Sequence, residues 1–312
     1  MPARPAERPI PIVTIVGPTA VGKSDLSLDL AERLGGEVVN TDSMQLYRSM
    51  DVGTAKLPVD ERRGIVHHLL DVLDVTEPAT VAEFQGWARA AIADCRGRGV
   101  VPILVGGSAL YTRAVVDRFE FPGTDPDVRA RLETELAEMG ALGLHRRLAA
   151  VDPEAAGRIL PSNGRRVVRA LEVIALTGRP FSASLPRLEY ADPATVQVGI
   201  DCPRPVLDER IALRVRRMWE AGLVDEVRGL ESAGLREGRT ASRALGYQQV
   251  LALLAGECTE EEAFEATVTG TRRFARKQDS WLRKDPRIGW VPWDASDRVE
   301  QALALVELAQ TA

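Results

Sequence analysis

Short apolar runs alternate with longer segments of helical periodicity along the first third of the chain. Three of these runs predict buried strands, at Ile12–Val16, Glu37–Asn40 and Val100–Val105. After the first run, Lys23–Leu34 repeats leucine at helical spacing. Before the third, Thr80 and Glu83 predict the capping box of a helix, whose buried face is expected to hold Phe84, Trp87, Ala91 and Cys95. Continuously apolar strands that alternate with such helices predict a parallel sheet with helices on both faces.

The pattern changes after about residue 118. From Asp125 to Gly178 the chain predicts one helix after another, with Asp-Pro starts at 125–126 and 152–153 and no strand candidate. We therefore expect an inserted, all-helical subdomain over residues 119–192, in which Phe181–Asp192 is the return linker. Residues 10–118 are expected to form the first part of an α/β core. Residues 193–312 are expected to complete it, with strands at Val196–Asp201 and Gly289–Trp293 and helices between them.

The composition is that of a soluble globular protein. The 312 residues are 45% hydrophobic and 27% charged, and no apolar run approaches the roughly 20 residues that a membrane helix needs. The chain starts without an apolar signal-peptide core, so we expect a cytoplasmic protein that does not contact a membrane. Cys95, Cys202 and Cys258 form no CxxC pair, which argues against a disulfide framework or a zinc knuckle. His67 and His68 have no suitably spaced third ligand, so no metal site is expected there.

A phosphate-loop pattern follows the first predicted strand, as Gly17-Pro18-Thr19-Ala20-Val21-Gly22-Lys23-Ser24. It stands between a strand and a helix start, which is the context that this pattern requires. The glycines let consecutive backbone N–H groups converge on phosphate oxygens, and the helix N-terminus adds partial positive charge. Lys23 neutralises the bound group, and Ser24 offers an oxygen to Mg²⁺. We therefore predict a P-loop NTPase-like fold, although the loop alone does not distinguish a nucleotide from another diphosphate.

The second magnesium carboxylate of an NTP hydrolase or kinase is not where it is expected. The run Val101–Val105 ends in two glycines and Ser108 instead of an aspartate. Asp42 is the carboxylate that follows a strand, at the sheet edge where α/β proteins place their sites. Asp42 is thus either a turn or cap residue, or a general base or magnesium contact beside the phosphate loop. Ser108 is either the N-cap of the next helix or a hydrogen-bond donor to an anion.

Charge is distributed unevenly along the chain. The 40 basic and 45 acidic residues give a net charge of −5. Salt screens charges beyond about 8 Å, so a partner that carries phosphates responds to the local patch of charge and not to the net charge. One helical segment near the end places six cations within about 140° of one another at 100° per residue, namely Arg272, Arg273, Arg276, Lys277, Arg283 and Lys284. Its opposite face, with Phe274, Trp281 and Leu282, is expected to pack on the protein body. Within the insertion, a second basic face contains Arg165, Arg166 and Arg169.

Eight sequence blocks together resemble those of bacterial tRNA dimethylallyltransferases. They are GPTAVGKS at 17–24, DSMQLY at 42–47, DVGTAK at 51–56, HHLLD at 67–71, VGGSALY at 105–111, RALE at 169–172, RALGY at 243–247 and RKQ at 276–278. The blocks stand in the order of that family and span about residues 10 to 293, which makes the resemblance more specific than the phosphate loop alone.

The resemblance implies transfer of the dimethylallyl group of dimethylallyl diphosphate to N6 of the adenosine just 3′ of the anticodon, with release of diphosphate. It implies that the phosphate loop holds this diphosphate with Mg²⁺, through Gly17, Thr19, Ala20, Val21, Gly22, Lys23 and Ser24. Asp42 is then the general base on the N6 amine, Ser108 is a catalytic contact where the family often has threonine, and Arg243 stabilises the leaving diphosphate. We expect a monomer.

The resemblance also implies a set of tRNA contacts spread over six stretches of the chain. These are Asp42, Ser43, Met44, Gln45, Ser108, Arg129, Arg165, Arg166, Arg169, Arg243, Gly246, Tyr247, Arg276, Lys277, Gln278 and Arg283. Because the target base lies in a tRNA loop, we expect the enzyme to extrude it into a pocket, which costs a few kcal/mol of unstacking. Contacts elsewhere on the RNA must offset that cost.

Three alternatives use the same features differently. A small-molecule or nucleotide kinase would turn over ATP at the phosphate loop, with the helical insertion as its lid. An ATP-switched RNA-binding protein would need the basic faces but neither Asp42 nor Ser108. An enzyme that prenylates free adenine nucleotides would have no use for two basic helical faces.

Overall fold

The computed structural model describes residues 9–119, 121–184 and 188–311. It divides the chain into two compact units. The first unit joins Met1–Val116 to Asp192–Ala312, and the second is Asp117–Ala191. The helical insertion that the sequence predicts over residues 119–192 falls on the second unit.

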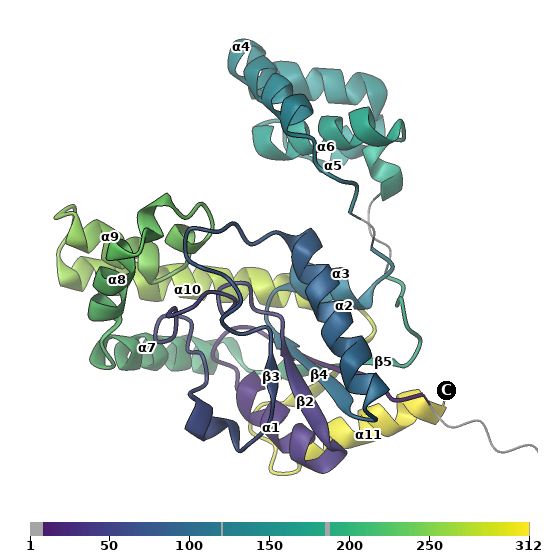
Figure 1. Cartoon of the computed structure of the whole chain (residues 1–312), viewed down its shortest axis with the longest axis vertical. Coiled ribbons are helices and arrows are strands. Elements are labelled where there is room, and N and C mark those ends of the chain that lie inside the picture. Colours follow the sequence, from purple (N-terminus) through teal and green to yellow (C-terminus); the bar gives the residue numbers. More distant parts are fainter. Residues whose placement is uncertain (1–8, 120, 185–187, 312) are drawn as a thin grey trace, which may run out of the picture. The chain divides into compact units, whose positions relative to one another are not determined.

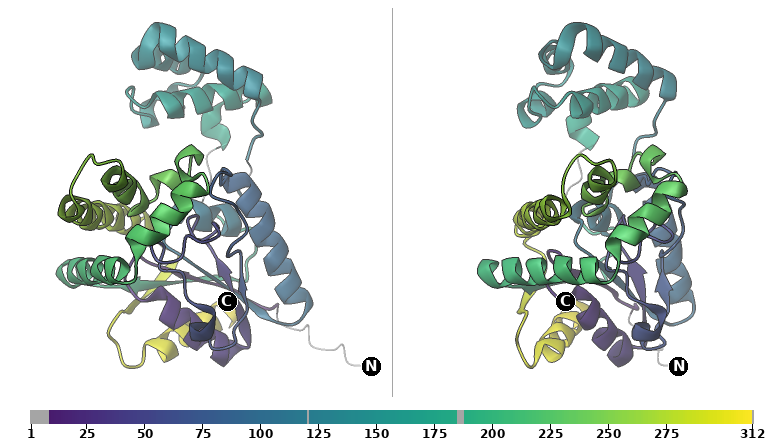
Figure 2. Two further views of the ribbon diagram at one scale, coloured as in Figure 1. Left: turned by 60° about the vertical axis from the view of Figure 1, so that its left-hand side comes forward. Right: turned by 90° about the vertical axis from the view of Figure 1, so that its left-hand side faces the viewer.

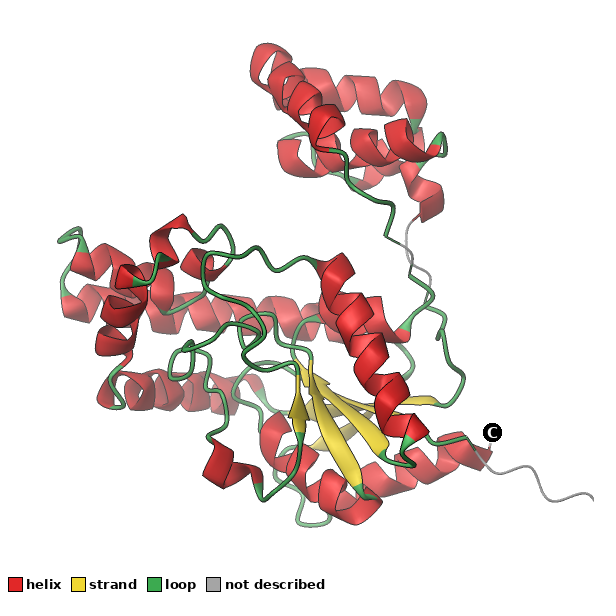
Figure 3. Ribbon diagram, in the orientation of Figure 1, coloured by secondary structure: helices red, strands yellow, loops and turns green. Residues whose placement is uncertain are grey.

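The first unit is built on a six-stranded sheet in which all neighbouring strands are parallel (Figure 3). Its strands are β1 Ile12–Val16, β2 Gly36–Asn40, β3 His67–His68, β4 Val101–Gly106, β5 Thr195–Asp201 and β6 Ile288–Pro292, in the order β3-β2-β4-β1-β5-β6. The predicted parallel sheet is confirmed. The strand order reverses at β1, and α/β proteins bind ligands at the carboxyl ends of the strands at such a point.

Helices cover both faces of this sheet (Figure 1). On one face α1 (Lys23–Leu34) and α11 (Arg298–Thr311) pack against alternate residues of the central strands, among them Val13 and Ile15. On the other face lie α2 (Val81–Gly97) and α3 (Ala109–Val116). The remaining helices of the unit contact one another in a cluster of their own (Figure 2), made of α7 Arg204–Glu220, α8 Leu223–Ser232, α9 Tyr247–Leu254 and α10 Glu260–Leu282. Short 3₁₀ turns are η1 Val59–Arg62, η3 Leu235–Glu237 and η4 Ala241–Arg243.

The helix α2 begins as predicted but buries a slightly different face. The Thr80 side chain accepts a hydrogen bond from the backbone N–H of Glu83, which is the predicted N-cap. The buried residues are Phe84, Ala88, Ile92 and Cys95. Trp87 and Ala91 are half-buried. The prediction placed the next inward residue three positions after Phe84, at Trp87, whereas in the structure it lies four positions after Phe84, at Ala88.

The second unit contains helices joined by loops, with an isolated β-bridge between Asp117 and Tyr190 near its two ends. Its elements are α4 Pro126–Val151, α5 Pro153–Arg158, α6 Gly164–Thr177 and the 3₁₀ turn η2 Phe181–Ser184. The predicted Asp-Pro starts are confirmed, since Asp125 and Asp152 cap α4 and α5 through their side chains. Gly140, at φ 71°, interrupts α4, and leucines of α4 pack against α6 in a separate core. Within the predicted return linker, residues 185–187 lie outside the described residues.

None of the described helices combines the length and the apolar character needed to cross a bilayer.

Candidate active site

A cavity of about 760 Å³ opens at the carboxyl ends of β1, β2 and β4. The segments that follow these three strands supply its walls, with the phosphate loop, Asp42, and Gly106 and Gly107. The opposite wall comes from α7 and α10, through three arginines and Phe274. All lining residues belong to the first unit.

The phosphate loop is held in shape by its own backbone and by α10. The Lys23 Nζ atom donates a hydrogen bond to the Pro18 carbonyl at 2.8 Å. The Thr19 N–H donates to Gln278 Oε1 at 3.0 Å, and Gln278 is buried. A Cβ atom at Gly107 would lie 2.3 Å from Gln278 Nε2, so a larger residue at this position would push the Gln278 amide away from the loop. The structure therefore places Gln278, which the resemblance assigns to tRNA, against the phosphate loop.

The cavity places several cations beside the phosphate loop. Burial and the neighbouring Arg214 guanidinium lower the pKa of Lys23 to about 7, although Asp42 acts in the opposite direction. Burial also lowers the pKa of Arg214. Arg210 and Arg217 line the same wall, and Arg210 Nε donates to the Ala20 carbonyl at 2.8 Å. An anion that enters this cavity therefore meets cations that are poorly solvated and already in place.

Proton uptake on ligand binding tests this electrostatic description. A bound diphosphate should raise the pKa of Lys23 from about 7 toward its ordinary value, so binding at about pH 8 should take up close to one proton and binding at about pH 6 almost none. Calorimetric titration at each pH, in two buffers with different ionisation enthalpies, measures this uptake. Subtracting the proton uptake measured with Lys23→Met removes the contribution of protons that the diphosphate itself takes up on binding. Equal uptake by the two proteins would contradict the charge assignment.

Asp42 combines the two alternatives that the sequence left open. Its Oδ1 atom accepts a hydrogen bond from the Met44 N–H at 2.9 Å, as a turn residue does. Its backbone is held by Asn40, whose Oδ1 accepts from the Asp42 N–H at 2.8 Å and whose Nδ2 donates to the Asp42 carbonyl at 2.9 Å. The carboxylate nonetheless lines the cavity, and Oδ2 has no hydrogen-bond partner among the described residues. Asp42 is therefore a positioned carboxylate with one oxygen left for a ligand.

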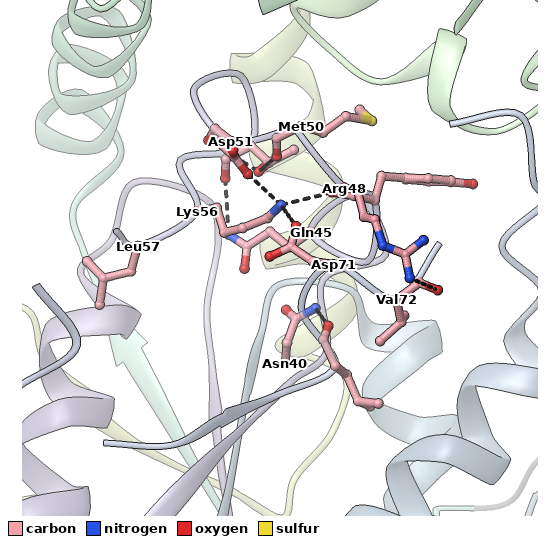
Figure 4. Close-up of polar contacts among 12 residues, drawn as sticks. Asn40, Gln45, Arg48, Met50, Asp51, Lys56, Leu57, Asp71 and Val72 are labelled. Carbon is pink, nitrogen blue, oxygen red and sulfur yellow. Dashed lines mark hydrogen bonds and ion pairs between the residues drawn. The ribbon is translucent and has the colours of Figure 1, made fainter. Parts of the chain in front are cut away.

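The loop that carries Asp42 is anchored by the buried ammonium of Lys56 (Figure 4). Lys56 Nζ contacts Asp51 Oδ1 and Asp71 Oδ1 at 2.6 Å each and donates to the Tyr47 carbonyl at 2.8 Å. A buried charge with these partners is costly to disrupt, because removing one partner leaves the other uncompensated. The cluster fixes the part of the loop from Tyr47 to Asp51, and Gln45 itself donates to the carbonyl oxygen of Thr54 at 3.1 Å.

Glu226 of α8 holds the same loop from outside. Its carboxylate accepts from the backbone N–H groups of Asp51, Val52 and Gly53, at 3.0, 2.7 and 3.1 Å. It also accepts from the Tyr247 hydroxyl at 2.6 Å. Tyr247 is fully buried, and Gly246 directly before it is buried too. Two residues that the resemblance assigns to tRNA thus lie beneath the surface, in contacts that support the loop.

Two predicted catalytic residues lie outside the cavity wall. Ser108 Oγ accepts from the Tyr111 N–H at 3.4 Å, which corresponds to the N-cap alternative for this residue. The described lining of the cavity includes Gly106 and Gly107 but not Ser108. Arg243 ends η4 and is exposed, and it is also absent from that lining. Arg243 therefore does not contribute to the described wall of this cavity.

The cations that do face the phosphate loop are the ones that sequence reasoning missed. Arg210, Arg214 and Arg217 all belong to α7 and line the cavity. Their spacing of four and then three residues places them on one face of a helix, which is a signal that the sequence contained. Glu226 offered no such signal, because its backbone partners are more than 170 residues away.

The helix α10 presents cations to solvent, and of its three apolar side chains predicted to be buried only Leu282 is. Arg276 and Lys277 are exposed and form no hydrogen bond or ion pair with the described residues. Phe274 and Trp281, expected to be buried, are 43% and 54% exposed. The buried face runs instead through Ala263, Thr267, Val268, Ala275, Gln278 and Leu282. The expectation was wrong for the two aromatic residues because the face of α10 that meets the protein body runs through Ala275, Gln278 and Leu282.

Three further predicted tRNA contacts, Arg283, Ser43 and Met44, already contact other parts of the protein or are partly buried. Arg283 pairs with Asp201 and Asp279, and its guanidinium lies 3.8 Å from the ring centre of Trp290. The side chains of Ser43 and Met44 are half-buried in the loop that carries Asp42.

Within the second unit, the predicted basic face divides into two kinds of arginine. Arg129 and Arg169 both pair with the fully buried carboxylate of Glu172. Arg165 and Arg166 are exposed and form no ion pair with the described residues. This unit therefore offers two unengaged arginines and two that also stabilise its fold.

Comparisons with known proteins agree on one family. The family model described as IPP transferase matches residues 45–285. A tRNA dimethylallyltransferase from a Nocardioides species is 65% identical over 302 residues, which cover 97% of either chain. A tRNA isopentenylpyrophosphate transferase of known structure from Bacillus halodurans is 38% identical and covers 97% of both chains, with a TM-score of 0.71. A eukaryotic dimethylallyltransferase, captured acting on tRNA, is 28% identical and covers 90% of this chain and 73% of its own, with a TM-score of 0.80.

Proposed function

Because this chain belongs to the IPP transferase family, we propose that the cavity beside its phosphate loop is the active site of a tRNA dimethylallyltransferase. The enzyme transfers the dimethylallyl group of dimethylallyl diphosphate to N6 of the adenosine adjacent to the anticodon on its 3′ side, and it releases diphosphate. One observation supports this assignment of the site above all: Lys23 and three arginines of α7 line the same cavity as Asp42, a carboxylate with one oxygen free of hydrogen bonds to the described residues.

The cationic side of the cavity suits the leaving group. As the bond between the allylic carbon and oxygen breaks, the diphosphate gains negative charge. Lys23 and Arg214 already face that position, with Arg210 and Arg217 on the same wall. Such pre-placed cations stabilise the transition state more than the ground state, because they need no reorganisation as charge develops. We assign to Arg214 the stabilisation of the leaving diphosphate, the role that the resemblance gives to Arg243.

Asp42 suits the nucleophile. The N6 amine of adenine is weakly nucleophilic, because its lone pair is delocalised into the ring. Removal of a proton as the C–N bond forms assists the attack, and a positioned base typically contributes 10²–10⁴-fold. The Met44 N–H donates to the Asp42 carboxylate, and Asn40 holds the backbone of Asp42, so the carboxylate is oriented and one of its oxygens remains to accept the proton.

A divalent metal fits the same cavity. Transferases that use prenyl diphosphates generally require one, and we propose Mg²⁺ for this chain. Oxygen ligands suit this hard cation, and both the Ser24 hydroxyl and the Asp42 carboxylate line the cavity next to Lys23. When bound, the metal neutralises charge on the diphosphate and so makes it a better leaving group.

We propose that the exposed cations hold the RNA. Extrusion of the target adenosine costs a few kcal/mol, which contacts to phosphates must offset. Arg276 and Lys277 on α10, and Arg165 and Arg166 on α6, are exposed and have no ion-pair partner among the described residues. Such cations give the salt-sensitive, sequence-independent part of RNA affinity.

The reaction itself is the direct test. Purified protein is incubated with Mg²⁺, labelled dimethylallyl diphosphate and unmodified tRNA in the absence of ATP, and the RNA is examined for label. We expect label at the adenosine 3′ of the anticodon and none when that base is replaced by guanosine. A strict requirement for ATP would support the kinase or ATP-switch alternatives instead.

Replacing Arg276 and Lys277 together with alanine should weaken tRNA binding and flatten its salt dependence. Each lost phosphate contact should reduce the slope of log affinity against log salt by nearly one. Affinity measured between about 50 and 200 mM salt gives this slope. The matched control is Arg33→Ala, an exposed arginine of α1 that pairs with Glu300 and is not among the proposed tRNA contacts, and it should leave the slope unchanged. An unchanged slope in the double variant would exclude this face of α10 from phosphate binding.

A further inference from the structure

Three side chains with metal-binding atoms meet on the sheet face that α2 covers. They are Glu37 at the start of β2, His68 of β3 and Cys95 near the end of α2. The sequence predicted no metal site at the histidine pair, because no third ligand had a suitable spacing. The fold brings both partners to His68 from about 30 residues away on either side. The cluster belongs to the first unit, and none of its members lines the active-site cavity.

The distances in this cluster resemble the edges of a tetrahedral site. Cys95 Sγ lies 3.5 Å from Glu37 Oε2 and 3.6 Å from His68 Nε2. Zinc binds sulfur at about 2.3 Å and nitrogen or oxygen at about 2.0–2.2 Å, so tetrahedral ligand atoms lie roughly 3.3–3.7 Å apart. Two of the three edges match this range. The third, from His68 Nε2 to Glu37 Oε2, is a hydrogen bond of 2.7 Å that would have to open by about 0.6 Å to fit.

The surroundings orient the ligands and leave a path to solvent. Arg98 donates to both oxygens of Glu37, at 2.7 and 2.6 Å. Since the Arg98 side chain is 44% exposed, it can keep the bond to Oε1 while a metal takes Oε2. Cys95 is buried, whereas the side chain of His68 is 22% exposed. An ion can therefore enter past His68, and a water molecule can complete its coordination.

We propose that Glu37, His68 and Cys95 bind one Zn²⁺ ion, with a water molecule as the fourth ligand. The donor set of one thiolate, one imidazole and one carboxylate suits zinc better than Mg²⁺ or Ca²⁺, which prefer oxygen alone. On binding, a Zn–S bond replaces the S–H bond of Cys95, and the proton leaves to solvent.

A bound ion would tie the edge strand β3 to β2 and α2. The segment directly after β3 supports the active site, because the Leu69 carbonyl accepts from Asn40 and Asp71 pairs with Lys56. A ligand that binds only the folded state raises its stability. Zinc should therefore raise the melting temperature and should act on catalysis, if at all, through the position of this segment.

The test is direct zinc binding by the full chain. Protein stripped with a chelator is titrated with Zn²⁺ against a chromophoric chelator, and with Co²⁺ to look for the near-ultraviolet charge-transfer band of a cobalt–thiolate bond. We expect one ion per chain and a cobalt–thiolate band. Cys95→Ser and His68→Gln should each lower the affinity by at least about 10-fold and abolish the rise in melting temperature, and Cys95→Ser should also remove the band.

Matched controls separate this site from other binding. His67→Gln changes the neighbouring histidine, which bonds to the Ile65 carbonyl, and Cys202→Ser with Cys258→Ser removes the other two thiols. These variants should bind zinc like the unmodified chain. Circular dichroism verifies that each variant is folded. Zinc binding that is absent, that survives both site variants, or that is lost in the control variants would overturn the proposal.

Discussion

Asp42→Asn is expected to lower kcat by 10²–10⁴-fold while tRNA still binds. The substitution keeps the size of the side chain and an oxygen that can accept from the Met44 N–H, but the amide cannot take a proton from the N6 amine. A positioned general base contributes about this factor, and a loss confined to kcat identifies an interaction made in the transition state. Single-turnover labelling of tRNA at saturating donor measures the chemical step, and filter binding measures tRNA affinity.

A second carboxylate provides the control for this experiment. Glu61 lines the same cavity but lies on η1 and is exposed. Glu61→Gln removes a negative charge at a similar site and should change kcat by less than a few-fold. A kcat for Asp42→Asn within a few-fold of the unmodified enzyme would remove Asp42 from the mechanism. Equal losses in both variants would indicate a general effect of charge in the cavity.

Arg214→Gln is expected to lower kcat/KM for dimethylallyl diphosphate by 10²–10³-fold. Removing one pre-placed group that stabilises developing negative charge typically has an effect of this size. Arg214 faces Lys23 and Asp42 across the cavity, and its Nη2 atom also donates to the Thr54 carbonyl at 3.3 Å. Steady-state kinetics with the donor varied and tRNA saturating measure the effect.

Arg243→Gln tests the competing assignment. The resemblance gives Arg243 the role at the diphosphate, but the structure places it on η4, exposed and away from the described cavity wall. We therefore expect at most a few-fold change with the donor varied, and any larger effect should be on tRNA binding. If Arg243→Gln lost more in kcat/KM for the donor than Arg214→Gln, the assignment from sequence would be restored.

Local sequence signals predicted most of the elements. Lys23–Leu34 forms a helix with the predicted bounds, and Ile12–Val16 forms the predicted strand. Gly35, in the left-handed conformation, ends the helix. These features depend on residues that are neighbours in the chain, so the hydrophobic pattern and the glycine positions contain the information needed to locate them.

The burial of helix faces was harder to predict. For α10, the pattern of apolar residues pointed to Phe274, Trp281 and Leu282, but the helix buries Leu282 together with Gln278 and leaves both aromatic rings exposed. Which face is buried depends on the shape of the surface that the helix meets. For α10 that surface includes α7, α9 and the phosphate loop, and its shape is not encoded in the local pattern.

Short stretches of chain are enough to predict the phosphate loop, the strands and helices around it, and the position of Asp42 at a strand end. Three further features depend on how distant elements pack: Arg214 and not Arg243 lines the described cavity, Gln278 braces the phosphate loop, and His68 meets Cys95. The last two contacts join residues 259 and 27 positions apart. Packing of whole elements brings such residues together, and the spacing along the chain contains no record of it.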